Sequence, residues 1–256
     1  MATLLKKYYQ ENKIPFSLNG RRFAVGDIHG CYKTFRSLIE TKIELTQYDQ
    51  LFLLGDYIHK GPRSKDTLNY ILKLIKRGYK VYPLRGNHED ELLNASKKKD
   101  TKLLRWLCRK SSDLLKDGKV REKHLDFIES LPYYYELHDF YLVHGGFNFT
   151  IENPLEDKKA MLWKRMRENE TDFGGIKRII HAHQPQAFEV IQNRVLTQAK
   201  IIGLDNGVNY LKKHRFYEVS KMGNLCALNL DTFELVVQPN VENSMKNQSK
   251  QKRKIA

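Results

Sequence analysis

Residues 23–30, FAVGDIHG, contain the pattern that decides the fold: three apolar residues, a glycine, and then an aspartate and a histidine two positions apart. A similar pattern returns at residues 51–56 (LFLLGD) and 81–89 (VYPLRGNHE). A short apolar run that ends at glycine is typical of a buried strand. Residues 32–42 and 64–77, between these runs, have the apolar spacing of helices. Strands that alternate with helices at this spacing predict βαβ units and a mainly parallel sheet.

Further strands are expected later in the chain. Apolar runs occupy residues 140–144, 177–181 and 200–204, and residues 224–230 and 234–238 form the last two. Each run is short enough for a strand and too short for a typical helix.

Two hairpins and one insertion complete the predicted secondary structure. Asn19-Gly20 lies between two apolar runs and predicts a hairpin over residues 14–26. Gln192-Asn193 indicates a second hairpin over residues 188–197. Residues 91–130 are rich in leucine, lysine and glutamate at helical spacing, which predicts a helical cap.

Polar side chains follow five of the predicted strands. They are Asp27 and His29, Asp56, Asn87 and His88, His144, and the pair His181 and His183. One such cluster is ordinary in a turn, but ligands bind beyond the carboxyl ends of the strands in an open α/β sheet, so the five are expected to converge on one crevice. Collecting carboxylates and imidazoles there is costly without a cation, which favours a metal site.

This array resembles the signature of calcineurin-like metallophosphoesterases, in the bacterial and phage serine/threonine phosphoprotein-phosphatase branch, and is also similar to diadenosine tetraphosphatases. The signature reads Asp-x-His, Gly-Asp-x-x-Asp-Arg and Gly-Asn-His-Glu, separated by two spacers. Residues 30–54 and 61–85 fill the spacers here, with 25 residues each. Further similar segments are residues 144–146 (HGG), 183–185 (HQP), 162–165 (LWKR), 204–207 (LDNG) and 223–228 (GNLCAL).

The resemblance implies an α/β fold: a central β-sandwich of mixed sheets flanked by helices, with the insertion at 91–130 as a helical cap. We expect one domain over residues 1–242, followed by a basic, disordered tail at 243–256.

The resemblance also implies a site with two metal ions and a hydroxide between them. The first metal would be held by Asp27, His29 and Asp56, and the second by Asp56, Asn87, His144 and His183. Mixed oxygen and nitrogen donors suit Mn²⁺, Fe or Zn²⁺ better than Ca²⁺, and Mn²⁺ is expected first. His181, two residues before the ligand His183, is expected to support it.

Four other residues complete the implied chemistry. His88 would protonate the leaving group, and Arg165 would clamp phosphate oxygens. Asn87 would contact the phosphate as well as the metal. Arg85 either contacts the phosphate or orients its loop. The remaining histidines, His124, His138 and His214, are interpreted as surface residues.

The second motif departs from the family pattern. His59 and Lys60 stand where the family has aspartate and arginine, and that aspartate pairs with the histidine acid. A protonated His59 would lower the pKa of His88 by repulsion, and Lys60 keeps a positive charge without bidentate geometry. Three interpretations follow: a preference for good leaving groups, a lower pH optimum, or a weak phosphatase that mainly binds phosphate. We prefer the first, because every implied metal ligand is present.

The expected activity is metal-dependent hydrolysis of phosphoric monoesters, with phosphoserine and phosphothreonine in proteins as first substrates. The alternative is hydrolysis of nucleotide polyphosphates such as diadenosine tetraphosphate. A third hypothesis, from a different class, is a protein that binds phosphate or nucleic acid without turnover.

Composition bears on these hypotheses and on location. There are 45 basic and 30 acidic residues, a net charge of +15, which attracts anions such as nucleic acid or phosphorylated partners. Lysines scattered along a soluble surface explain the same charge. Three distant cysteines do not form a disulfide framework, and no apolar stretch is long enough to span a membrane, so a cytoplasmic protein is expected.

Overall fold

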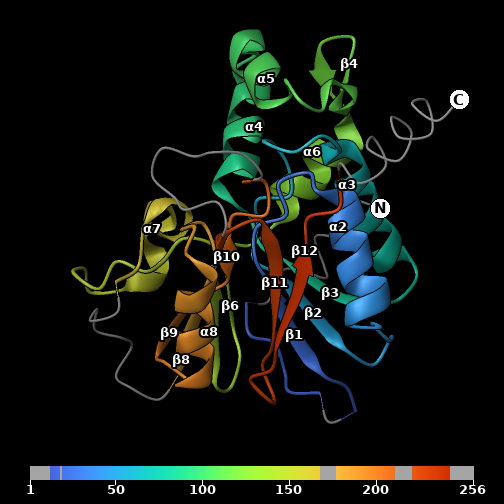
Figure 1. The fold of residues 1–256 in the computed structure, drawn as a ribbon. Coiled ribbons are helices and arrows are strands. Elements are labelled where there is room, and N and C mark those ends of the chain that lie inside the picture. Colours follow the sequence, from blue (N-terminus) through green and yellow to red (C-terminus); the bar gives the residue numbers. More distant parts are fainter. Residues whose placement is uncertain (1–11, 18, 168–176, 211–220, 243–256) are drawn as a thin grey trace, which may run out of the picture.

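A computed structural model describes residues 12–17, 19–167, 177–210 and 221–242 (Figure 1). Its first sheet has the strand order β10-β11-β1-β2-β3, with β12 paired to β11. The strands are β1 (Arg22–Val25), β2 (Gln50–Leu53), β3 (Lys80–Pro83), β10 (Asp205–Asn206), β11 (Asn224–Asn229) and β12 (Leu235–Pro239). Strands β1, β2 and β3 are parallel, and β11 runs antiparallel to β1. The parallel βαβ arrangement predicted for the first half of the chain is confirmed.

The second sheet has the order β6-β7-β8-β9. It consists of β6 (Tyr134–Glu136), β7 (Phe140–Val143), β8 (Arg178–His181) and β9 (Ile201–Gly203). Strand β6 is antiparallel to β7, whereas β7, β8 and β9 are parallel. Both sheets are therefore mixed, as the resemblance implied.

The side chains of the second sheet alternate between two apolar clusters. Leu142, Ile180 and Ile202 belong to the large core that also contains the side chains of the first sheet. Their neighbours in the strands face a smaller cluster with Phe147 and Met161 on the other side. Because successive residues of a strand point to opposite faces, this alternation places the main core between the two sheets.

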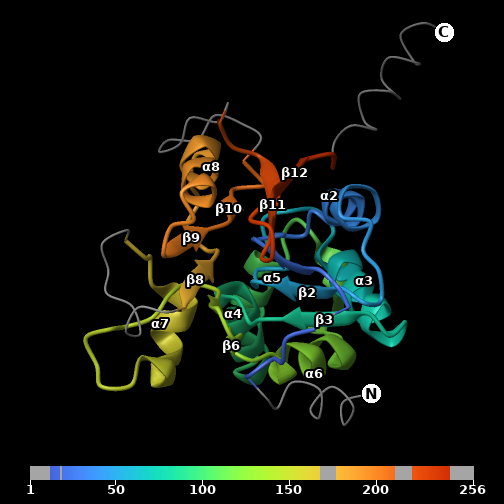
Figure 2. The same cartoon turned by 90° about the horizontal axis from the view of Figure 1, so that it is seen from below.

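Helices cover the outer faces of this sandwich (Figure 2). The first sheet is covered by α2 (Tyr32–Ser37), which continues into the π-helical turn η1 (Leu38–Lys42), and by α3 (Ser64–Lys76). The second sheet is flanked by α7 (Lys158–Trp163) and α8 (Phe188–Leu196), and the short η3 (Pro154–Glu156) precedes α7. Helix α3 buries Leu68, Ile71 and Leu74, which recur every three residues and form one apolar stripe.

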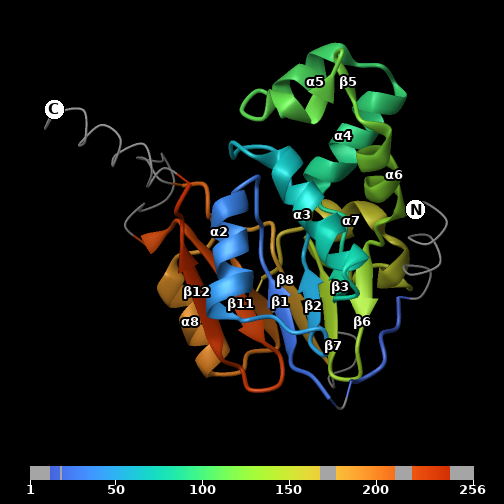
Figure 3. The same ribbon diagram turned by 90° about the vertical axis from the view of Figure 1, so that its right-hand side faces the viewer.

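The predicted cap stands at one end of the sandwich (Figure 3). It contains α4 (Asn87–Lys97), α5 (Thr101–Leu107), η2 (Ser112–Leu114), the strands β4 (Leu115–Lys116) and β5 (Lys119–Val120), and α6 (Glu122–Ser130). The Asp100 carboxylate begins α5 by accepting hydrogen bonds from the backbone N–H groups of Lys102 and Leu103. The insertion is thus mostly helical, with a small antiparallel hairpin that its composition did not indicate.

Both predicted hairpins in the body of the chain are wrong. Strand β1 pairs with β2 and β11, and the Ile14 N–H donates to the Glu136 carbonyl, so the first arm of the expected 14–26 hairpin lies elsewhere. Residues 188–197 form helix α8 and its C-terminal cap, with Ile191 and Val195 buried four residues apart. That spacing is helical, and it outweighs the weak turn preference of Gln192-Asn193.

No helix within the described part of the chain has the length and apolar character of a membrane span. Cys31, Cys108 and Cys226 are buried free thiols. The basic tail and His214 lie outside the described residues.

Candidate active site

The carboxyl ends of the parallel strands present the predicted polar clusters. Asp27 and His29 follow β1, Asp56 follows β2, and Asn87 and His88 begin α4 after β3. From the second sheet, His144 follows β7 and His183 follows β8. The structure brings all of these residues together at one edge of the sandwich.

Asp56 lies at the centre of this group. Its Oδ2 atom is 3.7 Å from His29 Nε2 and 3.7 Å from His88 Nε2, while its Oδ1 atom is 3.5 Å from His144 Nε2. Two sets of candidate metal-binding groups share this carboxylate: His29, Asp56 and His88, and Asp56, His144 and His183. One carboxylate with two oxygens can serve two cations, which agrees with the bridging role that the resemblance implies.

Asp27 and Asn87 extend the two sets. Asp27 Oδ2 lies 3.4 Å from His29 Nε2. The Asn87 Oδ1 atom lies 3.0 Å from both His144 Nε2 and His183 Nδ1. The expected ligand sets of both metals are therefore gathered, and His88 lies next to the first of them.

Two histidines of these sets, His144 and His29, are oriented as ligands. His144 Nδ1 is 2.8 Å from the Leu54 carbonyl and His29 Nδ1 is 3.3 Å from the Ile58 carbonyl. A carbonyl only accepts, so each Nδ1 donates and the Nε2 lone pair faces the site. Burial lowers the pKa of His29 and His144, and it lowers the pKa of His183 to about 3. Neutral imidazole is the form that binds metal ions.

The carboxylates fit divalent cations as well. Asp27, Asp56 and Asp205 are all buried. Burial and the negative charges of Asp205 and Asp56 raise the pKa of Asp27. The Asp205 Oδ2 atom has no hydrogen-bond partner among the described residues. Buried carboxylates packed against one another are unfavourable until a cation neutralises them, so this donor set suits divalent metals with mixed oxygen and nitrogen coordination.

Backbone strain is concentrated in the same residues. Among the described non-glycine residues with positive φ are His29 (48°), Asp56 (51°) and His183 (63°). This conformation costs a side chain about 1 kcal/mol or more, and it persists where surrounding contacts impose it, frequently at functional sites.

Glu89, the last residue of the third motif, imposes part of this conformation. Its buried carboxylate accepts hydrogen bonds from the backbone N–H groups of Asp56 (2.8 Å), Tyr57 (2.9 Å), Ile58 (3.2 Å) and Gly86 (3.1 Å). Burial and Asp56 raise the pKa of Glu89, and these donors oppose that shift. The sequence offered no role for Glu89, which the structure identifies as the support of the Asp56 loop.

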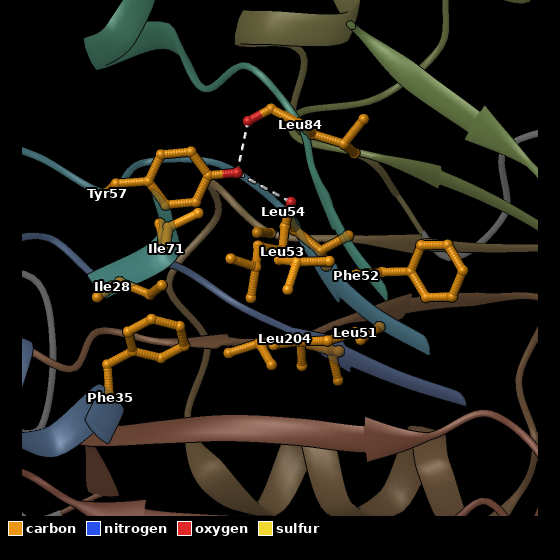
Figure 4. Close-up of a cluster of buried hydrophobic side chains, with 14 of the residues drawn as sticks. Ile28, Phe35, Leu51, Phe52, Leu53, Leu54, Tyr57, Ile71, Leu84 and Leu204 are labelled. Carbon is orange, nitrogen blue, oxygen red and sulfur yellow. Dashed lines mark hydrogen bonds between the residues drawn. The ribbon is translucent and has the colours of Figure 1, made fainter. Parts of the chain in front are cut away.

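Tyr57 anchors the same loop from the core side (Figure 4). Its hydroxyl contacts the carbonyls of Leu84 at 2.6 Å and Leu53 at 3.1 Å, which joins the ends of β3 and β2. Gly86 allows the close approach of the two loops, since a Cβ atom there would lie 2.3 Å from Asp56 Oδ1.

The residues that replace the family Asp-Arg point in different directions. His59 Nδ1 donates to the Leu107 carbonyl of the cap at 2.8 Å, and its ring lies 4.6 Å from the ring of His88. Burial lowers the pKa of His59 to about 4, so it is neutral at neutral pH and does not repel a protonated His88 as the sequence suggested. Lys60 Nζ lies 2.9 Å from His29 Nε2, inside the site.

Glu91, which sequence reasoning did not single out, places a carboxylate beside the candidate acid His88. Its Oε2 atom is 3.0 Å from His88 Nδ1, one helical turn away on α4. This contact leaves His88 Nε2 facing Asp56. The helix predicted after residue 88 contained the clue, because a carboxylate three residues from a histidine lies on the same helix face.

The remaining predicted residues are placed as follows. Arg85 donates to Asp90, Tyr133 and the Glu129 carbonyl, which favours orientation of the cap over contact with phosphate. Arg165 is exposed just after α7.

Three further histidines, His181, His124 and His138, have separate surroundings. His181 Nδ1 contacts the Ala182 carbonyl, and its ring lies near Gly203. His124 is fully buried with Nε2 at 3.0 Å from Asn69 Oδ1, so its interpretation as a surface residue is wrong, whereas His138 is exposed as expected.

Comparison with known proteins agrees with this architecture. The family model described as calcineurin-like phosphoesterase matches residues 21–213. The chain belongs to this family. Its members' fold implies divalent metal ions, and the donor set described above fits them.

Relatives and solved structures refine the comparison. The chain is 26% identical over 200 residues to a symmetrical bis(5'-nucleosyl)-tetraphosphatase of Pseudomonas syringae pv. syringae, covering 76% of this chain and 63% of the relative. It is 32% identical over 128 residues to a protein of the same name from Vibrio parahaemolyticus, covering 48% and 44%. The chain thus spans less than two thirds of the length of these relatives.

Two solved structures share the fold. A putative diadenosine tetraphosphatase has a TM-score of 0.62 at 20% identity, covering 91% of this chain and 99% of that one. A protein serine/threonine phosphatase from Saccharomyces cerevisiae has a TM-score of 0.60 at 15% identity, covering 94% and 88%. The expected β-sandwich of mixed sheets flanked by helices is confirmed.

Proposed function

We propose that this chain is a metal-dependent phosphoric-ester and anhydride hydrolase whose substrates are bis(5'-nucleosyl) tetraphosphates. The observation that carries the choice of substrate is the similarity to relatives named symmetrical bis(5'-nucleosyl)-tetraphosphatase, over as many as 200 residues. This favours the nucleotide polyphosphate alternative over the phosphoserine and phosphothreonine substrates that the sequence suggested first.

The chemistry of the leaving group supports the same choice. Symmetrical hydrolysis adds water across the central P–O–P bond and releases two nucleoside diphosphates. The leaving atom is then a phosphate oxygen, a much weaker base than the alkoxide released from a serine phosphate, so it needs less help from a proton donor. A site with a neutral histidine at position 59 is suited to such a substrate.

The metal-binding residues follow from the geometry. Asp27, His29 and Asp56 would hold one ion, and Asp56, Asn87, His144 and His183 the other. Bound divalent metals would polarise the phosphoryl group and lower the pKa of water for attack on phosphorus. The identity of the metal is part of the proposal, with Mn²⁺ as the first candidate.

Three other side chains bind the phosphate groups or protonate the leaving group. His88 donates from Nε2 to the departing phosphate oxygen, because Glu91 fixes its Nδ1 atom. Lys60 Nζ lies 2.9 Å from His29 Nε2, and its ammonium group would pair with a phosphate oxygen of the substrate. Arg165, exposed at the end of α7, supplies a second, bidentate group for phosphate.

The test compares three substrates on the purified chain, with and without Mn²⁺. Di(adenosine-5') tetraphosphate, a phosphoserine peptide and p-nitrophenyl phosphate are assayed by product chromatography, with Asp56→Asn as the blank. The expected result is metal-dependent formation of ADP with a larger kcat/KM than for the peptide. A larger kcat/KM for the peptide, or ADP release that persists in the blank, would overturn the proposal.

A further inference from the structure

The two tryptophans of this protein lie in similar settings on two different elements, helix α5 of the cap and helix α7. The sequence contains only Trp106 and Trp163, and both are about half exposed, at 47% and 45%. Trp106 belongs to helix α5 of the cap, and Trp163 ends α7 beside the second sheet (Figures 1 and 3).

A row of rings connects Trp106 to the centre of the site. The Trp106 ring lies 4.5 Å from His59, tilted by 34°, and the His59 ring lies 4.6 Å from His88. His88 Nε2 is then 3.7 Å from Asp56 Oδ2. His59 also binds the carbonyl of Leu107, the residue after Trp106, so it fixes the position of this part of the cap.

A second row connects Trp163 to the same carboxylate. The Trp163 ring lies 5.9 Å from His183, in an edge contact, and the His183 ring lies 5.0 Å from His144. His144 Nε2 is 3.5 Å from Asp56 Oδ1. The two rows therefore end at the two oxygens of one side chain, and each has a tryptophan at its outer end.

An arginine lies against one tryptophan, and another arginine follows the second tryptophan in the sequence. The guanidinium of Arg109 lies 4.9 Å from the centre of the Trp106 ring. Arg165 follows Trp163 by two residues and is exposed. The exposed Arg109 side chain shows that a flat, delocalised group fits against this indole, and a base that stacks there takes its place.

We propose that Trp106 and Trp163 each bind one nucleobase of the substrate by stacking, on either side of the phosphate chain at Asp56. This inference rests on the proposed function and extends it, because a substrate with a base at each end requires two such surfaces. Base stacking on an aromatic side chain accepts every base, so recognition would depend on the presence of two bases and little on their identity.

The kinetic test uses Trp106→Ala and Trp163→Ala. For di(adenosine-5') tetraphosphate, each substitution is expected to raise KM by about fivefold to 150-fold, the loss of roughly 1–3 kcal/mol of stacking. For inorganic tetraphosphate, which has no base, the increase is expected to be much smaller. The matched control is Tyr48→Ala. Tyr48 is an aromatic residue that is 66% exposed and lies outside the candidate site, so this substitution should leave the KM for both substrates unchanged.

A binding test avoids turnover altogether. The variants Trp106→Phe and Trp163→Phe each leave one tryptophan as a fluorescent reporter in the metal-free chain. Stacking predicts that ADP quenches both reporters, and that pyrophosphate at the same concentration does not.

The outcomes separate the two proposals. Equal quenching by ADP and pyrophosphate, or unchanged KM in both alanine variants of a chain that hydrolyses the dinucleotide, would overturn the inference and leave the proposed function standing. Failure to hydrolyse the dinucleotide at all would overturn the proposed function, and the quenching experiment would still decide whether the tryptophans bind bases.

Discussion

Replacing Glu91 with glutamine should slow catalysis by weakening the control of His88. The Glu91 carboxylate lies 3.0 Å from His88 Nδ1, and its side chain is 30% exposed. A hydrogen bond to a charged group contributes about 1.5–3 kcal/mol, and partial exposure favours the lower value. A loss of about 1.5 kcal/mol in the transition state corresponds to about a tenfold decrease in kcat.

The size of the decrease should depend on the leaving group. An alkyl phosphate releases an alkoxide, which needs a proton in the transition state more than the p-nitrophenolate released from the aryl ester. The kcat of Glu91→Gln is therefore expected to fall further for the alkyl phosphate. Steady-state kinetics with both esters measure this, and Glu122→Gln, an exposed carboxylate in the first turn of α6, is the matched control.

A second substitution, at position 59, tests whether a carboxylate there can replace the carboxylate of Glu91 beside His88. Aspartate tolerates the left-handed backbone at position 59, where φ is 67°, and the His59 ring is 4.6 Å from that of His88. His59→Asp should therefore restore much of the activity lost in Glu91→Gln. Equal losses for both esters in Glu91→Gln, with no recovery in the double variant, would refute this reasoning.

Three further predictions concern stability. Glu89→Ala leaves four backbone N–H groups without their acceptor and should lower the free energy of unfolding by about 3 kcal/mol or more, measured by urea titration; a loss below about 1 kcal/mol would contradict the role given to Glu89. Asp27→Asn should stabilise the metal-free chain, because burial and the negative charges of Asp205 and Asp56 raise the pKa of Asp27, and it should reduce the gain in melting temperature on adding Mn²⁺; a destabilised metal-free variant would show that carboxylate repulsion is not the dominant effect at Asp27. Burial lowers the pKa of His124 to about 4, below its value near 6.5 in the unfolded chain, so the folded state binds fewer protons and stability should fall as pH drops from about 6.5 to 4. His124→Gln should make this fall shallower in urea titrations at pH 7 and 5, and an identical pH dependence would contradict the assignment.

Much of the fold could be predicted because it follows from repeated local patterns. Buried strands, their glycine ends and the intervening helices each occupy a continuous stretch of sequence, as at residues 23–30. The two wrong hairpins show the limit of this approach. The partners of β1 are residues 50–53 and 227–229, and nothing within residues 14–26 records that preference. Pairing between distant strands depends on the whole core, whereas a turn dipeptide is a weak local preference.

The candidate site shows the same contrast between local sequence patterns and contacts with residues distant in sequence. Asp27, Asp56 and His144 could be identified from sequence because each stands within three residues of the end of a strand in the sheets. The contacts that orient them could not, since the Glu89 carboxylate binds the backbone of residues 56–58, more than thirty positions away. Almost every residue carries a backbone N–H group, so a hydrogen bond between a side chain and the backbone leaves no recognisable motif in the sequence.

The exchange at position 59 shows why a missing motif residue is weak evidence of lost activity. The carboxylate that the family places at 59 acts on a histidine ring, and any carboxylate that reaches that ring can do the same. Glu91 reaches it from the same helix, at 3.0 Å, which requires no loop from another part of the chain. Position 59 is then free for a residue that binds the cap, and His59 does so through the Leu107 carbonyl and the Trp106 ring. The substitution therefore couples the cap to the candidate acid, and a change in the cap should alter the chemistry as well as the binding of the substrate.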